Sequence, residues 1–235
     1  IRNCDWSSDV CSSDLAGNKS LLNATVSYLI TSNNYYQTKD FLPSDTADKT
    51  EFNGYTGAIS FERNTLNKKQ FANEGTLLSI QVRYVNIREE TKPGSTSPDR
   101  ALEINYHDWY RARLKYENYF LHRRHIKIGF SGELNISNLP LFNNYTASVV
   151  NAPAFEPILE MHTLYLPEFH SQTFAGIGSR NIISIRNNLD LRLEAYLFQP
   201  YKEILNTDLS KAVYGKPFDK RYYLASGGVV YHSPI

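Results

Sequence analysis

The sequence predicts an all-β fold: an antiparallel transmembrane β-barrel, of which this chain holds a fragment of about eight strands as an open, curved sheet. Three observations predict it. Apolar and polar residues alternate along eight segments, and a strand points successive side chains to opposite faces. The longer segments reach about 10–14 residues, against about 5–6 in globular sheets and the roughly 9–11 that cross a membrane. The connections between them are long and short by turns.

The alternation is strictest in the fourth, fifth and seventh segments and loosest in the sixth and eighth, which contain several glycines. No segment shows convincing helical periodicity, so every expected element is a strand. In chain order, the expected strands are residues 22–30, 55–61, 78–84, 110–120, 126–136, 173–185, 189–197 and 222–232.

Outer-membrane barrels join their strands by short periplasmic turns and long extracellular loops. On this basis LHRRH (121–125) and IRNNL (185–189) are expected to be periplasmic turns. REETKPGSTSPDRAL (88–102) and NLPLFNNYTASVVNAPAFEP (138–157) are expected to be extracellular loops. The expected connections are residues 32–54, 65–75, 89–106, 122–124, 138–171, 186–188 and 201–220.

The charged faces of the strands are expected to line the interior of the barrel. An Arg or Lys directed at lipid near the bilayer midplane would cost about 2–4 kcal/mol, whereas charges in a lumen are satisfied by one another and by water. Structural lining is the commoner role for such residues, and a substrate path is the alternative. The predicted lining consists of Arg111, Arg113, Lys115, Glu117, Lys127, Glu133, Asp190, Arg192 and Glu194.

A soluble sandwich or a lipocalin-like barrel that binds a small ligand would show the same alternation, with its apolar side facing a core. Strand length and the unequal connections favour the membrane barrel. No apolar run approaches the roughly 18 residues of a membrane helix, which excludes a helical membrane protein. The net charge of +1 gives no reason to expect a nucleic-acid partner.

No catalytic, cofactor-binding or metal-binding residues are expected. GFSG (129–132) lacks one residue of the G-x-S-x-G nucleophile motif and lies in an alternating strand. GIGSR (176–180) lacks the G-x-G-x-x-G spacing that holds a phosphate, and the six His are scattered without H-E-x-x-H.

The first 15 residues are expected to lie outside the fold. Asp5–Leu15 resembles the translation, in a single frame, of a common short-read sequencing adapter. The chain has no other Cys, and no His near in sequence, that would complete a zinc site with Cys4 and Cys11. An artefact explains these two residues better than a disulfide or half a zinc site does. Excluding residues 1–15 removes one Arg and three Asp, which lowers Lys plus Arg from 25 to 24 and Asp plus Glu from 24 to 21. The single domain is then 16–235, and the chain, which starts at Ile1, is expected to be a fragment.

Five stretches resemble a bacterial family, the patatin-like phospholipases whose C-terminal part is an outer-membrane barrel of the bacterial surface antigen (BamA/TamA-like) superfamily. Within the second stretch, FERNTLNKKQFANEGTLL (61–78) resembles the recurrent strand–turn–strand of that superfamily. The stretches are NYYQTKDF, FNGYTGAISFERNTLNKKQFANEGTLLSIQVRYVN, LPLFNNYTASVVNAPAFEP, NIISIRNNLDLRLEAYLFQPYKEI and KRYYLASGGVVYHSPI.

The resemblance implies a barrel of sixteen strands and, upstream, a patatin domain whose Ser–Asp dyad hydrolyses lipid acyl esters. This chain contains neither G-x-S-x-G nor Asp-Gly, so the dyad would lie outside it. The resemblance further implies a location in the bacterial outer membrane, contact with its lipid, a lipid substrate bound by the upstream domain, and insertion by the barrel assembly machinery.

Barrels of this superfamily that insert or translocate proteins carry an Arg-Gly-Phe-type motif in a long loop that reaches into the lumen. LPLFNNYTASVVNAPAF (139–155), the corresponding region, has no Arg-Gly. The sequence therefore favours a barrel that anchors or exports a lipid hydrolase, with a protein-assembly or translocation barrel as the alternative.

Overall fold

The computed structural model describes residues 20–36, 40, 42–97, 101–142, 145–186, 188–207 and 211–232. The stretch that resembles a translated adapter, with Cys4 and Cys11, lies outside these residues.

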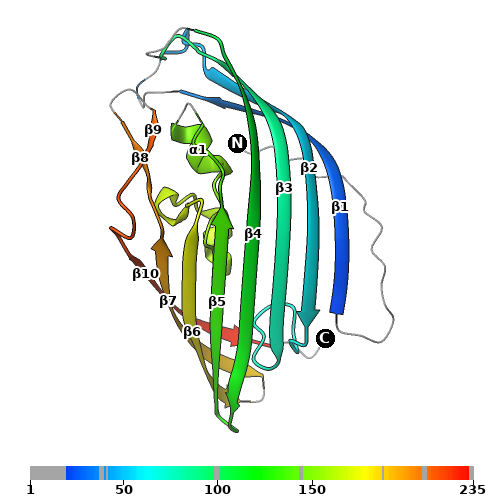
Figure 1. The fold of residues 1–235 in the computed structure, drawn as a ribbon. Coiled ribbons are helices and arrows are strands. Elements are labelled where there is room, and N and C mark those ends of the chain that lie inside the picture. Colours follow the sequence, from blue (N-terminus) through cyan, green and yellow to red (C-terminus); the bar gives the residue numbers. More distant parts are fainter. Residues whose placement is uncertain are drawn as a thin grey trace.

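Eight long strands form one antiparallel sheet that is curved and open (Figure 1). Each strand pairs with the next along the chain, except that β7 pairs with β10, and the two edge strands β1 and β10 are not paired with each other. The predicted all-β fold, an open curved sheet of eight strands, is thereby confirmed. The strands are β1 (Ser20–Tyr35), β2 (Asp48–Asn64), β3 (Thr76–Lys92), β4 (Glu103–His122), β5 (Ile126–Ser137), β6 (Phe174–Arg186), β7 (Leu189–Pro200) and β10 (Tyr222–Tyr231).

The first four strands are longer than the sequence predicted, at 16 to 20 residues. Most of the additional residues lie at one end of the sheet, in DKTEFNG, NIREETK and EINYHDW, where polar residues also occupy the outer face. Backbone pairing needs no apolar face, so the ladders continue beyond the point where alternation stops. The end of the sheet that carries these extensions is called the loop end. The opposite end, with the connections between β2 and β3, β4 and β5, and β6 and β7, is called the turn end.

The long connections contain short elements that the sequence did not predict. The helix α1 (Tyr145–Asn151) and the 3-10 helices η1 (Leu159–Thr163) and η2 (Pro167–Phe169) lie between β5 and β6. A seven-residue helix covers about two turns, too few to show helical periodicity. β8 (Ile204–Asn206) and β9 (Ala212–Tyr214) form a small separate hairpin. No helix in the described parts of the chain is long and apolar enough to cross a membrane.

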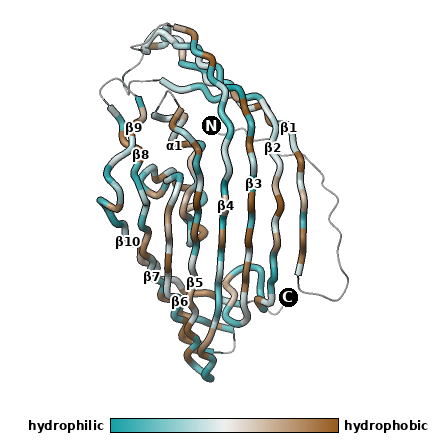
Figure 2. Tube along the Cα trace, in the orientation of Figure 1, coloured by the Kyte–Doolittle hydropathy of each residue, from teal (hydrophilic) through white to brown (hydrophobic). Residues whose placement is uncertain are grey.

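The apolar face of the sheet is exposed and the charged face is buried, which is the reverse of a soluble sheet. Val26, Ile30 and Tyr106 are 83, 71 and 78% exposed, whereas Glu89 is 0% and Asp190 3% exposed. The alternation of hydrophobic and hydrophilic positions is visible along the strands in Figure 2. The exposed side is called the outer face here, and the concave side, which the residues between β5 and β6 cover, is called the inner face (Figure 1).

Candidate functional site: the inner face and its inserted segment

The nine charged residues predicted to line the interior all lie on the inner face. They alternate with exposed apolar residues along their strands, and the register places Lys115 opposite Glu133 and Ser184 opposite Asp190. Arg113 pairs with Glu133 at 2.7 Å, and Lys115 with Glu117 at 3.3 Å. The nine are Arg111, Arg113, Lys115 and Glu117 on β4, Lys127 and Glu133 on β5, and Asp190, Arg192 and Glu194 on β7.

A chain of polar contacts crosses the inner face from β4 to β7. The Arg180 guanidinium pairs with Glu117 at 2.5 Å and donates from Nε to the Tyr196 hydroxyl at 2.9 Å. Tyr196 in turn donates to Glu194 at 2.7 Å. Buried charges are stable only when paired and hydrogen-bonded, and this chain supplies both kinds of contact. The sequence places Arg180 on the inner face by its alternation, but its partner Glu117 lies 63 positions away and carries no local signal.

Asp190 joins three separate parts of the chain at the turn end. It accepts hydrogen bonds from Ser184 Oγ at 2.7 Å and Asn73 Nδ2 at 3.3 Å, and its Oδ2 lies 2.9 Å from Nε2 of His232. Asn73 belongs to the β2–β3 connection, and His232 directly follows the edge strand β10. The Asp190 carboxylate therefore ties a distant connection and an edge strand to β7.

The β2–β3 connection, residues 65–75, folds over the inner face instead of projecting from the sheet. Its Ala72 carbonyl accepts a hydrogen bond from Nη1 of Arg192 at 3.0 Å, and the Phe71 ring lies 5.6 Å from the same guanidinium. Gly75 ends the connection with φ of +98°, and a Cβ there would lie 2.2 Å from the Thr65 carbonyl oxygen, so only glycine fits. These contacts hold the connection across to β7 and cover the turn end.

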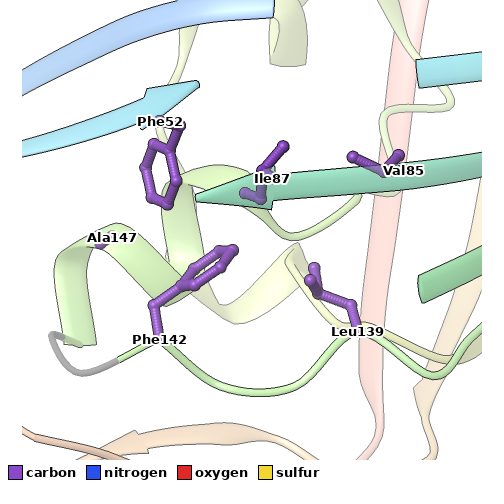
Figure 3. Packing of buried hydrophobic residues seen from close by; sticks show 6 residues of the cluster. All are labelled: Phe52, Val85, Ile87, Leu139, Phe142 and Ala147. Carbon is purple, nitrogen blue, oxygen red and sulfur yellow. The ribbon is translucent and has the colours of Figure 1, made fainter. Parts of the chain in front are cut away.

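The segment between β5 and β6, residues 138–173, is likewise seated on the inner face. Figure 3 shows Phe142 of this segment inside an apolar cluster with residues of β2 and β3. The Phe142 ring lies 4.9 Å from Phe52 and 5.2 Å from His107, whose Nε2 contacts the buried Glu89 carboxylate at 2.7 Å. The other members of the cluster are Val85, Ile87, Leu139 and Ala147.

A second anchor of the inserted segment lies over β6 and β7. Phe155 stacks on Phe198, with ring centroids 5.5 Å apart and an angle of 12° between the planes. The ring occupies the space above Gly176, where a Cβ would come within 2.2 Å of it. The sequence predicted residues 138–157 as an extracellular loop. In the structure two aromatic anchors fold this segment back onto the sheet, an arrangement for which the alternation of the strands carries no signal.

The motifs examined for catalysis lie within strands. GFSG is part of β5, where Ser131 is buried on the inner face, and GIGSR is part of β6. Within the residues that the structure describes, no three His, Cys, Asp or Glu side chains gather as a metal site would require. Among the described residues, the inner face presents paired charges and the chain segments that pack on it.

Comparison with known proteins gave no match of the chain to any protein-family model, curated protein or solved structure.

Replacing Phe142 by Ala is expected to release the inserted segment from the inner face. Truncation of a buried Phe costs about 3–5 kcal/mol, and Phe142 is 3% exposed. Tyr165, an aromatic residue of the same segment that is 56% exposed, provides the matched control as Tyr165→Ala. Limited proteolysis between β5 and β6 should accelerate strongly in the first variant only. Equal cleavage rates in the two variants would contradict the docking described here.

Because of Glu74, which lies at the turn end, the free energy of unfolding of the sheet should depend on pH. The Lys127 ammonium, 2.7 Å away, donates a hydrogen bond that lowers the pKa of the Glu74 carboxyl below its ordinary value. A lowered pKa means stability that is complete above about pH 4.5 and is lost as the pH falls through the folded-state pKa. The pair is partly exposed, so we expect a contribution of about 0.2–1 kcal/mol.

The measurement for this pair is the free energy of unfolding in detergent as a function of pH. Glu74→Gln should reduce the acid-dependent loss of stability, while Glu62→Gln, an exposed substitution on β2, should leave it unchanged. An unchanged pH profile in Glu74→Gln would show that the contact with Lys127 contributes nothing.

Proposed function

We propose that this chain is the outer-membrane β-barrel portion of a bacterial patatin-like phospholipase, which anchors or exports an upstream lipid acyl hydrolase. The observation that carries the proposal is the exposed apolar outer face of the sheet. Burying such a face in lipid removes it from water, whereas a soluble barrel would expose its charges instead. The hydrolase part of the proposal rests on the family resemblance of the five sequence stretches.

The dimensions of the outer face support a membrane location. On β4 the exposed aromatic residues Tyr110 and Phe120 lie ten residues apart, which is about 33 Å along a strand and about 25 Å along the membrane normal at a tilt of about 40°. Ala112 and Leu114 lie between them on the same face. Outer-membrane barrels carry an apolar band about 25 Å tall between two aromatic girdles.

Cross-strand tyrosine pairs continue the girdle at the loop end. Tyr84 and Tyr110 are opposite in register with ring centroids 4.9 Å apart, and Tyr28 and Tyr55 form the same arrangement on β1 and β2. Amphipathic rings of this kind are enriched where a membrane meets water. The loop end would then face the cell exterior, and the turn end the periplasm.

The covered inner face supports an anchoring role. The β2–β3 connection and the segment 138–173 both occupy the concave side of the sheet, so the part of the barrel interior that this sheet would enclose is packed with protein. The same inserted segment favours the second candidate, a protein-assembly or translocation barrel, because such barrels carry a long loop that reaches into the lumen. The absence of Arg-Gly from that segment weighs against this candidate.

Single cysteines on adjacent positions of β3 test the membrane location. In a background whose other cysteines are changed to Ser, the variants Gln81→Cys and Val82→Cys differ only in the face that carries the thiol. In outer membranes from cells that express the reading frame containing this chain, a water-soluble maleimide should label position 81 and spare position 82. Rapid labelling of position 82, or recovery of a soluble monomer, would refute the membrane barrel.

The hydrolase is tested on the same membranes. We expect them to release fatty acid from phospholipid, and we expect this activity to disappear when the Ser of an upstream G-x-S-x-G motif is changed to Ala. Insertion should fail when the barrel assembly machinery is depleted. Absence of acyl hydrolysis, together with loss of other outer-membrane proteins in a deletion strain, would replace the proposal by the assembly candidate.

A further inference from the structure

We infer that Arg83 and Arg111, with Arg113, form a binding site for a phosphate group on the inner face between β3 and β4. The site would accept inorganic phosphate or a phosphomonoester head group. The inference goes beyond the proposed function and concerns only the inner face, so it does not depend on the presence of an upstream hydrolase.

The first observation is a pair of like charges in direct opposition. Arg83 on β3 and Arg111 on β4 are register partners on the inner face, and Arg113 follows two residues later on the same face. Like charges directly opposite each other on neighbouring strands destabilise a sheet. Such a cluster is stable when an anion lies between its members.

The second observation is the shortage of acid around these three arginines. Glu133 pairs with Arg113, and Arg111 donates from Nε to the neutral amide oxygen of Asn135 at 2.9 Å. Arg83 makes no hydrogen bond or ion pair with any side chain that the structure describes. Three positive charges against one negative charge leave an excess of two, which matches a phosphate dianion.

Other arginines of the same face are fully partnered. Arg180 pairs with Glu117, and Arg192 pairs with Glu194 at 3.0 Å. The sheet therefore has acids to place beside arginine, but these two lie on β4 and β7, and neither is a register partner of Arg83. The position opposite Arg83 on its other side is Ala58 of β2, which contributes no charge.

The third observation is a set of unsatisfied polar atoms on the same face of the neighbouring strands. Arg83 Nε, Thr56 Oγ1 and Asn23 Oδ1 are buried without a hydrogen-bond partner among the described residues, and all three lie on the inner face of β1–β3. Buried polar atoms are normally paired. Arg83 Nε and the Thr56 hydroxyl are both able to donate to phosphate oxygens, and guanidinium groups match the geometry of phosphate.

Thermal unfolding of the reading frame that contains this chain, purified in detergent, tests the site. Inorganic phosphate should raise the unfolding temperature by several degrees relative to chloride at equal ionic strength, because a ligand that binds the folded state stabilises it. A short-chain phosphatidic acid in the micelles provides the second arm. The ligand that raises the unfolding temperature at the lower concentration identifies the source of the phosphate group.

Arg83→Gln should weaken the apparent phosphate affinity roughly 10-fold or more, the effect of losing a charge-assisted hydrogen bond. It should not destabilise the protein in chloride, since it removes the repulsion from Arg111. Arg63→Gln, the same change at an exposed position on β2, is the matched control and should retain the full phosphate effect. If Arg83→Gln does not fold, Arg83→Lys keeps the charge and should reduce the phosphate effect.

Two results would overturn the inference. One is an equal rise in unfolding temperature with chloride and phosphate, which would be an effect of ionic strength alone. The other is a phosphate effect of unchanged size in Arg83→Gln, which would place the anion elsewhere. Either result would leave the labelling of positions 81 and 82 unaffected, so the membrane proposal and the phosphate site fail separately.

Discussion

Seven antiparallel hydrogen-bonded ladders join β1 through β7 and β10 into one sheet, and their register decides what every other part of the molecule meets. A slip of one residue in any ladder would move a whole set of side chains to the opposite face. The observed register keeps apolar residues on the outer face of all eight strands. Leu114, for example, lies opposite Ile80 on one side and Leu134 on the other. The same register puts the charged strand residues on the inner face, beside the apolar clusters that hold the inserted segment, and the charge network follows from it.

The inner face is stable because distant segments of the chain cover it and form hydrogen bonds with its charged side chains. Arg192 holds the β2–β3 connection through the Ala72 carbonyl, and Phe142 seats the inserted segment against β2 and β3. Each of these contacts joins parts of the chain that are far apart in sequence. The Arg83–Arg111 pair differs from the rest of this face, since its charges are left to a partner of opposite sign. Arg180 and Arg192, on the same face, are paired with acids of the sheet itself.

The strands were predictable because alternation is a local property with a period of two residues. The segment 126–136 was predicted almost residue for residue, and β5 is Ile126–Ser137. The start of β4 was not, because Glu103–Trp109 continues the ladder after the apolar alternation weakens. The predicted lining residues lie together on one face, but Arg180, Tyr196 and His232 were missed. Their roles depend on neighbours supplied by other strands.

The eight strands, and the residues that share a face, follow from the amino-acid sequence alone, since both depend on local periodicity. The sequence also carried the resemblance on which the lipid-hydrolase proposal rests. The folded sheet was needed to show that the segment 138–173 lies on the inner face and that residues 65–75 reach across to β7. It alone placed Arg83 opposite Arg111. Docking and charge pairing depend on the curvature and register of the whole sheet, and no short stretch of sequence encodes these.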